Sequence, residues 1–150
     1  ISIFSTVIHL NSNVLITYPN IDQGSQLIKE ELIKFARIDP KKYFIIPSLG
    51  NHNYLSSLKL FDVIIGNSSS GIIEAPIIGI PSINIGNRQK GRTAFGKVFN
   101  LEGSKEELID LLKTIAKNKN EYQLPRSLQI GSKSPSYEII RILKEKQSNL

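Results

Sequence analysis

Two residue types, cysteine and methionine, are absent from the 150 residues of this sequence. Without cysteine, the chain forms no disulfide, no thiolate nucleophile and no thiolate metal site. Without methionine, Ile1 is not a natural start, so we expect further residues upstream of it. No apolar run approaches the roughly 18 residues that a membrane-spanning helix needs, and no basic segment leads into a long apolar stretch, as in a secretory signal. We therefore expect a cytoplasmic protein with no membrane partner.

The net charge is +6, from 19 basic and 13 acidic residues. The lysines are scattered apart from Lys41-Lys42 and the segment Lys113–Lys119. No basic stripe alternates with aromatic residues, which is the pattern that single-stranded nucleic acid favours. The charge indicates either a solvated lysine-rich surface or attraction for an anionic ligand. We expect no nucleic-acid partner.

Short apolar runs alternate with amphipathic stretches, and the chain length suits one domain over residues 1–150. The predicted strands are residues 13–18, 42–46, 62–66, 81–85 and 97–101. The predicted helices are residues 22–37, 53–60, 70–78, 104–117 and 136–146. This alternation predicts an α/β fold, a Rossmann-like doubly wound parallel sheet with helices on both faces. Ligands of such sheets bind beyond the carboxyl ends of the strands.

A run of three serines and a glycine, Ser68, Ser69, Ser70 and Gly71, directly follows a predicted strand and opens a predicted helix. The first turn of a helix presents unpaired N–H groups and a partial positive charge. Hydroxyls and a glycine allow an anion to approach the backbone, which favours a phosphate site. The alternative is a helix cap surrounded by other polar residues. The spacing matches no named nucleotide-binding motif.

Glu74 stands between the apolar pairs Ile72-Ile73 and Ala75-Pro76, where a buried carboxylate needs hydrogen-bond partners. A ribose diol is one suitable partner, because a carboxylate can accept two hydroxyl donors. The alternative is a partly exposed surface glutamate. Farther along, the loop at residues 87–92 is rich in donors, and the fork of Arg88 suits a diphosphate. A solvated basic loop would explain the same residues.

Other candidate residues are weaker. Asn20 and Asp22 follow the first predicted strand, where a turn and, for Asp22, a helix cap are the ordinary explanation. His9 and His52 are isolated, and no His, Asp and Glu cluster has metal-ligand spacing. No Ser–His–acid arrangement can be argued either. We expect no metal, no cofactor and no catalytic residue in this chain.

Three stretches together resemble the hydrolysing UDP-N-acetylglucosamine 2-epimerases. They are TYPNIDQG at residues 17–24, IGNSSSGIIEAP at residues 65–76 and GIPSINIGNRQKGR at residues 79–92. The segment Ser48-Leu49-Gly50, followed by Asn53-Tyr54-Leu55, is similar to the bacterial members. The resemblance covers nearly the whole chain, and the second and third stretches are long enough to make chance a poor explanation.

The resemblance implies a two-domain, glycosyltransferase-B-like fold that binds its nucleotide sugar between two halves. Residues 1–150 would be the C-terminal, UDP-binding half, without the N-terminal half and without the first strand of this half. The residues that the resemblance assigns to UDP, together with their neighbours in the serine run, are Ser68, Ser69, Ser70, Gly71, Glu74, Arg88, Asn20 and, more loosely, Ser48. The serines would hold the diphosphate, and Glu74 would contact the ribose hydroxyls.

The reaction implied by the resemblance begins when a base removes the proton at C2 of the sugar. UDP leaves from C1, which gives a 2-acetamidoglucal, and water then adds to release N-acetylmannosamine for sialic-acid-type biosynthesis. The family's catalytic carboxylates belong to the absent half, so this chain alone is expected to be inactive. The intact enzyme is expected to be a homo-oligomer, a dimer or higher. Two alternatives stay open: the donor-binding half of a UDP-sugar glycosyltransferase, and a non-catalytic nucleotide-binding module.

Overall fold

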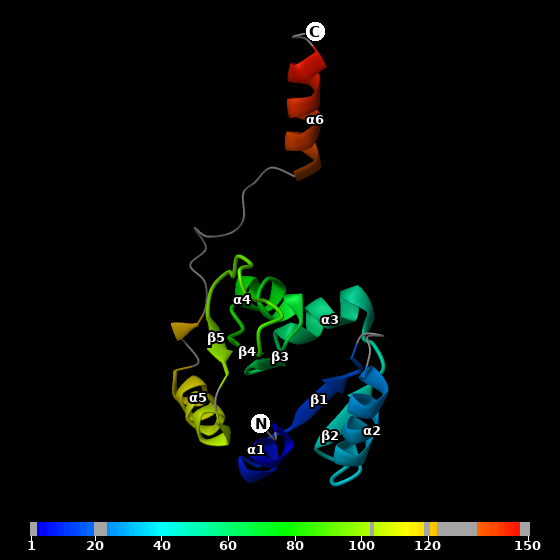
Figure 1. The fold of residues 1–150 in the computed structure, drawn as a ribbon, viewed down its shortest axis with the longest axis vertical. Helices are drawn as coiled ribbons and strands as arrows, with labels where there is room; N and C mark the ends of the chain where they lie inside the picture. Colours follow the sequence, from blue (N-terminus) through cyan, green and yellow to red (C-terminus); the bar gives the residue numbers. More distant parts are fainter. Residues whose placement is uncertain (1–2, 20–23, 103, 119–120, 123–134, 148–150) are drawn as a thin grey trace.

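Five short parallel strands form where the sequence has its apolar runs (Figure 1). The computed structural model describes residues 3–19, 24–102, 104–118, 121–122 and 135–147. Each strand lies inside its predicted segment, and the bounds are β1 Val14–Thr17, β2 Tyr43–Ile46, β3 Ile64–Gly66, β4 Ser82–Ile85 and β5 Val98–Leu101. The predicted α/β class with parallel pairing is confirmed.

Helices connect or flank these strands, and their bounds are α1 Ile3–His9, α2 Ser25–Ala36, α3 Gly50–Leu58, α4 Glu74–Ile78, α5 Lys105–Lys117 and α6 Pro135–Gln147. A single 3₁₀ turn, η1, spans Ser69–Gly71. Helix α2 begins at Ser25, later than the predicted start at Asp22. The residue before it, Gly24, has φ 85°, which is not a right-handed helical conformation. Asp22 itself lies outside the described residues. Ser104 caps α5 as predicted, since its Oγ accepts a hydrogen bond from the Glu107 N–H at 3.3 Å.

The described strands form two parallel sheets rather than the single sheet that the sequence predicts. One sheet pairs β1 with β2, and the other has the order β3-β4-β5. In register, Ile16 lies beside Ile45 in the first sheet, and Asn84 lies beside Asn100 in the second. Within the described chain, β1 and β3 therefore each have one paired edge and one unpaired edge.

Each sheet has its own core, and α1 contributes to both. The aromatic rings of Phe4, Phe35 and Tyr43 stack in the first core, with centroid distances of 4.5 and 4.4 Å. In the second core, α5 packs two buried and two partly buried side chains against β4 and β5. Ile3 of α1 contacts both clusters. Helix α1 therefore joins the two sheets.

Helix α6 carries large apolar side chains that no described part of the chain covers. Five of them are at least 47% exposed, namely Tyr137, Ile139, Ile140, Ile142 and Leu143. None of the helices in the described residues combines the length and the apolar character that crossing a membrane requires.

Candidate functional site

The serine run forms a tight turn just after β3. Ser68 is in extended conformation, and its Oγ accepts a hydrogen bond from the Ser70 N–H at 3.4 Å. The Ser68 carbonyl accepts from the Gly71 N–H at 3.1 Å. The Ser69 carbonyl accepts from two further N–H groups, those of Ile72 and Ile73, both at 3.0 Å. These bonds fix the backbone of the turn and place the serines at the carboxyl end of the sheet, where a ligand is expected.

The helix predicted over residues 70–78 is broken, and a proline accounts for the break. In a continuous helix the Ile72 carbonyl would accept from the backbone nitrogen of residue 76, but Pro76 has no N–H. The Phe95 N–H, from the loop after β4, donates to that carbonyl instead at 3.1 Å. The result is the turn η1 followed by the five-residue helix α4. The prediction of one continuous helix behind the serines was therefore wrong. The dipole of the five-residue helix that forms instead is smaller than that of the predicted helix.

Two contacts anchor the serine turn to its surroundings. The Tyr54 hydroxyl of α3 is hydrogen-bonded to the Ser70 hydroxyl. On the other side, the Ser82 hydroxyl of β4 donates to the Gly71 carbonyl. Burial raises the pKa of Tyr54; its hydrogen bond with Ser70 lowers that pKa, and the nearby charge of Glu74 raises it. The pKa stays above its usual value, so the phenol is neutral at physiological pH.

Glu74 is the first residue of α4 and is partly buried beside the serine turn. Its Oε2 atom is buried and has no hydrogen-bond partner within the described residues. Leaving a buried carboxylate oxygen unpaired costs free energy. A ligand that donates hydroxyl hydrogens would satisfy this atom.

The basic loop after β4 is tied to the serine turn. Gln89 is only 6% exposed, and its Nε2 donates to the Asn67 carbonyl at 2.7 Å. Arg88 and Lys90 on either side are exposed. The loop ends at Gly96, where φ is 64° and a Cβ atom would lie 2.9 Å from two atoms of Pro76. The loop is thus fixed at both ends against the segment that carries the serines and Glu74.

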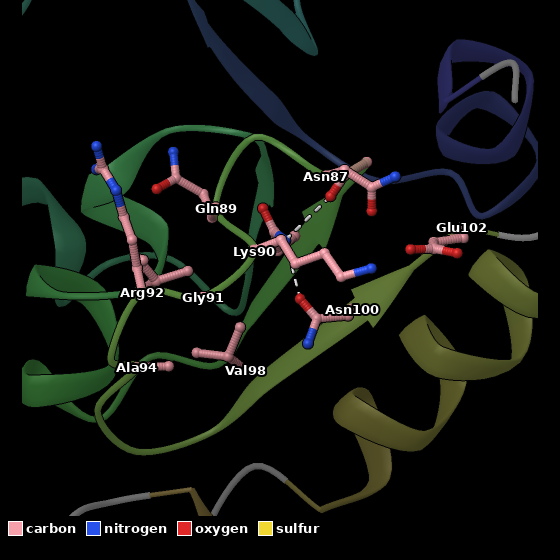
Figure 2. A pocket seen from close by; sticks show the side chains of 12 residues that line it. Asn87, Gln89, Lys90, Gly91, Arg92, Ala94, Val98, Asn100 and Glu102 are labelled. Carbon is pink, nitrogen blue, oxygen red and sulfur yellow. Dashed lines mark hydrogen bonds between the residues drawn. The ribbon is translucent and has the colours of Figure 1, made fainter.

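A cavity of about 250 Å³ lies on the β5 side of this loop (Figure 2). Asn84 and Asn100 are bonded to each other across β4 and β5, with Nδ2 to Oδ1 at 2.9 Å. Lys90, Arg92 and Glu102 lie around the same space. None of the predicted UDP ligands that the structure describes lines this cavity.

The remaining predicted residues are placed as follows. Ser48 is exposed after β2, and its Oγ accepts from the N–H of Gly50, the first residue of α3, at 3.1 Å. Asn20 lies outside the described residues. His9 belongs to α1, as expected for a helical residue. The structure thus places Glu74, at the start of α4, beside the turn of Ser68–Gly71, and Gln89 bonds the loop of Arg88 to Asn67, which leads into that turn.

Residues 1–144 match the family model described as UDP-N-acetylglucosamine 2-epimerase. The chain belongs to the UDP-N-acetylglucosamine 2-epimerase family. The resemblance seen in the sequence is confirmed by this match, which includes every described element up to most of α6.

Curated members of this family are similar to parts of the chain. A GDP/UDP-N,N′-diacetylbacillosamine 2-epimerase (hydrolyzing) of Campylobacter jejuni is 39% identical over 92 residues, 61% of this chain and 24% of that protein. A UDP-N-acetylglucosamine 2-epimerase of Neisseria meningitidis is 34% identical over 100 residues, 67% of this chain and 26% of that protein. A UDP-N,N′-diacetylbacillosamine 2-epimerase (hydrolyzing) of Legionella pneumophila is 31% identical over 108 residues, which are 72% of this chain and 28% of that protein. The chain therefore spans about a quarter of the length of these relatives.

Two residues of the candidate site in this epimerase-family chain were not singled out from the sequence. Tyr54 lies in a short amphipathic segment, where an aromatic residue usually indicates packing against the core. Gln89 lies among exposed basic residues, and nothing in the sequence separates the buried member of that loop from its neighbours. Both contacts join segments far apart in the chain, 16 and 22 residues respectively. Local patterns carry no signal for them.

Proposed function

We propose that residues 1–150 form the C-terminal, UDP-binding domain of a hydrolysing UDP-N-acetylglucosamine 2-epimerase. The substrate would be UDP-N-acetylglucosamine or a related UDP-amino sugar, and the products of the former are N-acetylmannosamine and UDP. The names of the Campylobacter and Legionella relatives support both the hydrolysing reaction and a diacetylated sugar as the alternative substrate. The name of an Escherichia coli relative, polysialic acid biosynthesis protein P7, supports the connection to sialic-acid-type sugars.

The observation that carries the proposal is the unpartnered Oε2 of Glu74 beside the serine turn. A nucleoside diphosphate has the matching groups, because its ribose carries hydroxyl donors and its diphosphate carries acceptors. Glu74 would accept from the ribose, while Ser68 and Ser69 donate to the diphosphate. Arg88, on the loop held by Gln89, would offset the charge that UDP gains as it leaves.

The rest of the enzyme would supply what this domain lacks. The base that removes the C2 proton would come from an N-terminal half, where the family resemblance places the catalytic carboxylates. The unpaired edges of β1 and β3 support a missing strand, since parallel strands are ordinarily paired on both sides and buried. We further propose that the intact enzyme is a cytoplasmic homo-oligomer.

Calorimetric titration of the intact protein with UDP tests the proposal. Glu74→Ala and Ser69→Ala should each weaken UDP binding by at least about 1 kcal/mol, the usual loss for a charged or multiple hydrogen bond. The controls are Glu121→Ala and Ser56→Ala, which change exposed residues outside the site. Binding that is unchanged in both site variants would show that these residues do not form the site, and a folded protein that binds no UDP would contradict the proposal itself.

A further inference from the structure

Tyr54 is the one described side chain of α3 that is hydrogen-bonded to the serine turn. Its hydroxyl bonds to Ser70, the middle residue of η1. Ser69 differs from Ser70, because its hydroxyl makes no hydrogen bond within the described part of the chain. One serine of the run therefore connects the turn to α3, and its neighbour keeps a hydroxyl available to a ligand.

We propose that Tyr54 is a positioning residue, which holds the serine turn through Ser70 so that Ser68 and Ser69 face the diphosphate. The proposal rests on the proposed function, because it assigns a role in the same nucleotide site. It adds a residue from α3, an element that the sequence connects with the site only loosely through Ser48.

The geometry supports this role from two directions. The turn is held on the β4 side by the bond from Ser82 to the Gly71 carbonyl, so Tyr54 supplies the second point of attachment. Tyr54 and Ser82 therefore hold the turn from two sides, in addition to the backbone hydrogen bonds within it. Within α3, the Ser57 hydroxyl donates to the Tyr54 carbonyl at 2.8 Å.

The chemistry of the phenol agrees with the geometry. Tyr54 is partly buried, and burial together with the neighbouring Glu74 charge keeps its proton in place over the physiological range. A neutral phenol can both donate and accept, so the bond to Ser70 persists while the Ser68 oxygen accepts from the Ser70 N–H. Phenylalanine would fill the same space without the bond, which makes Tyr54→Phe the informative change.

The first measurement is amide hydrogen exchange in the intact protein. The amides of Gly71, Ile72 and Ile73 bond to carbonyls of the turn and report its order. Tyr54→Phe and Ser70→Ala should each speed their exchange by about fivefold, as expected for losing one hydrogen bond. Tyr137→Phe, an exposed change on α6, is the control and should have no effect. Unchanged exchange in Tyr54→Phe would overturn the proposal.

The second measurement separates phosphate positioning from general stability. Tyr54→Phe should weaken UDP binding by about fivefold and leave uridine binding within about twofold, because uridine lacks the groups that the turn would hold. In a Ser70→Ala background, Tyr54→Phe should have no additional effect on UDP affinity, since the two changes remove one contact. Ser70→Thr, which keeps the hydroxyl, should restore most of the affinity.

The outcomes distinguish this proposal from the proposed function. Equal losses for UDP and uridine, or additive losses for Tyr54→Phe and Ser70→Ala, would overturn the positioning role while UDP binding stands. A wild-type protein that binds no UDP would overturn the proposed function and, with it, the role of Tyr54 toward a phosphate. In that case the exchange rates would still decide whether Tyr54 holds the turn.

Discussion

The Nε2 atom of Gln89 lies 2.7 Å from the carbonyl oxygen of Asn67. This bond joins the loop after β4 to the residue that leads into the serine turn. Gln89 is nearly buried, and its Oε1 has no partner within the described residues. This amide donor therefore holds the start of the basic loop, next to Arg88, against the segment that leads into the serine turn.

Replacing that donor should loosen the loop. Gln89→Glu keeps the shape but cannot donate to the Asn67 carbonyl while it is ionised, and it buries oxygens that need donors. We expect a loss of about 1–3 kcal/mol in the free energy of unfolding, measured by urea denaturation, together with weaker UDP binding. Lys97→Gln, an exposed change, serves as the control. Wild-type stability in Gln89→Glu would show that the bond does not hold the loop.

The role proposed for Glu74 can be tested on the ligand as well as on the protein. If its carboxylate accepts from the ribose hydroxyls, Glu74→Ala should cost about 1–3 kcal/mol of UDP binding. The same substitution should cost clearly less with 2′-deoxy-UDP, because one donor is already gone. Calorimetric titration of the wild-type protein and of Glu74→Ala with each ligand gives the coupling free energy between Glu74 and the 2′-hydroxyl. Equal losses for UDP and 2′-deoxy-UDP would place Glu74 away from the 2′-hydroxyl.

Local sequence features predicted the elements well. The five strands are apolar runs bounded by Pro, Gly or polar residues, and the cap of α5 is a short-range hydrogen bond within one turn. The break after η1 could have been anticipated in part, because Pro76 cannot donate to the Ile72 carbonyl. The partner that replaces it, Phe95, could not, because that contact spans the loop and depends on tertiary packing.

The sequence selects candidate ligand residues, whose binding role stays a prediction, but it does not select the residues that support them. Ser68 and Glu74 are polar residues that follow a strand, where open sheets bind ligands, so position alone selects them. The bond of Gln89 to Asn67 and the bond of Tyr54 to Ser70 exist only after the sheet has brought distant segments together. The division of the strands into two sheets depends equally on long-range pairing.

The close approach of Gly96 to Pro76 should make glycine necessary at this position. A Cβ atom there would lie 2.9 Å from the Pro76 carbonyl oxygen, and φ of 64° disfavours any side chain. We expect Gly96→Ala to lower the free energy of unfolding by about 2–4 kcal/mol, combining strain and clash. Gly91→Ala is the matched control, because φ is 81° there but no atom lies within 4 Å. It should lose only about 1–2 kcal/mol.

Equal losses in the two glycine variants would show that the backbone conformation alone sets the effect, and that the contact with Pro76 contributes nothing. Urea denaturation of the intact protein measures both losses under the same conditions.

The cap of α5 should make stability depend on pH. The pKa of Glu106 is lowered from its usual 4.5, first by its own backbone N–H and then by the Ser104 hydroxyl. A carboxyl group with a lowered pKa stabilises the fold above its unfolded pKa, and this contribution is lost as the pH falls through the folded value. Ser104→Ala should therefore destabilise more at pH 7 than at pH 3.

At pH 7 the loss of the cap should be about 1 kcal/mol, measured by urea denaturation. Thr114→Ala, which removes a hydroxyl bonded to the Asp110 carbonyl within α5, is the control and should show no such pH dependence. If Ser104→Ala lost the same free energy of unfolding at both pH values, the Ser104 hydroxyl would not stabilise the ionised form of Glu106.

The unpaired edges of β1 and β3 and the exposed apolar face of α6 should make residues 1–150 associate when they are produced alone. Open strand edges can pair with another chain, and an apolar face of this size favours contact between molecules. We expect light scattering to rise with concentration and thermal unfolding to be broad. Replacing Ile139 and Leu143 of α6 by lysine should reduce the scattering only in part, because the strand edges remain. A monodisperse sample with one cooperative transition would show that residues 1–150 need no further strand to fold.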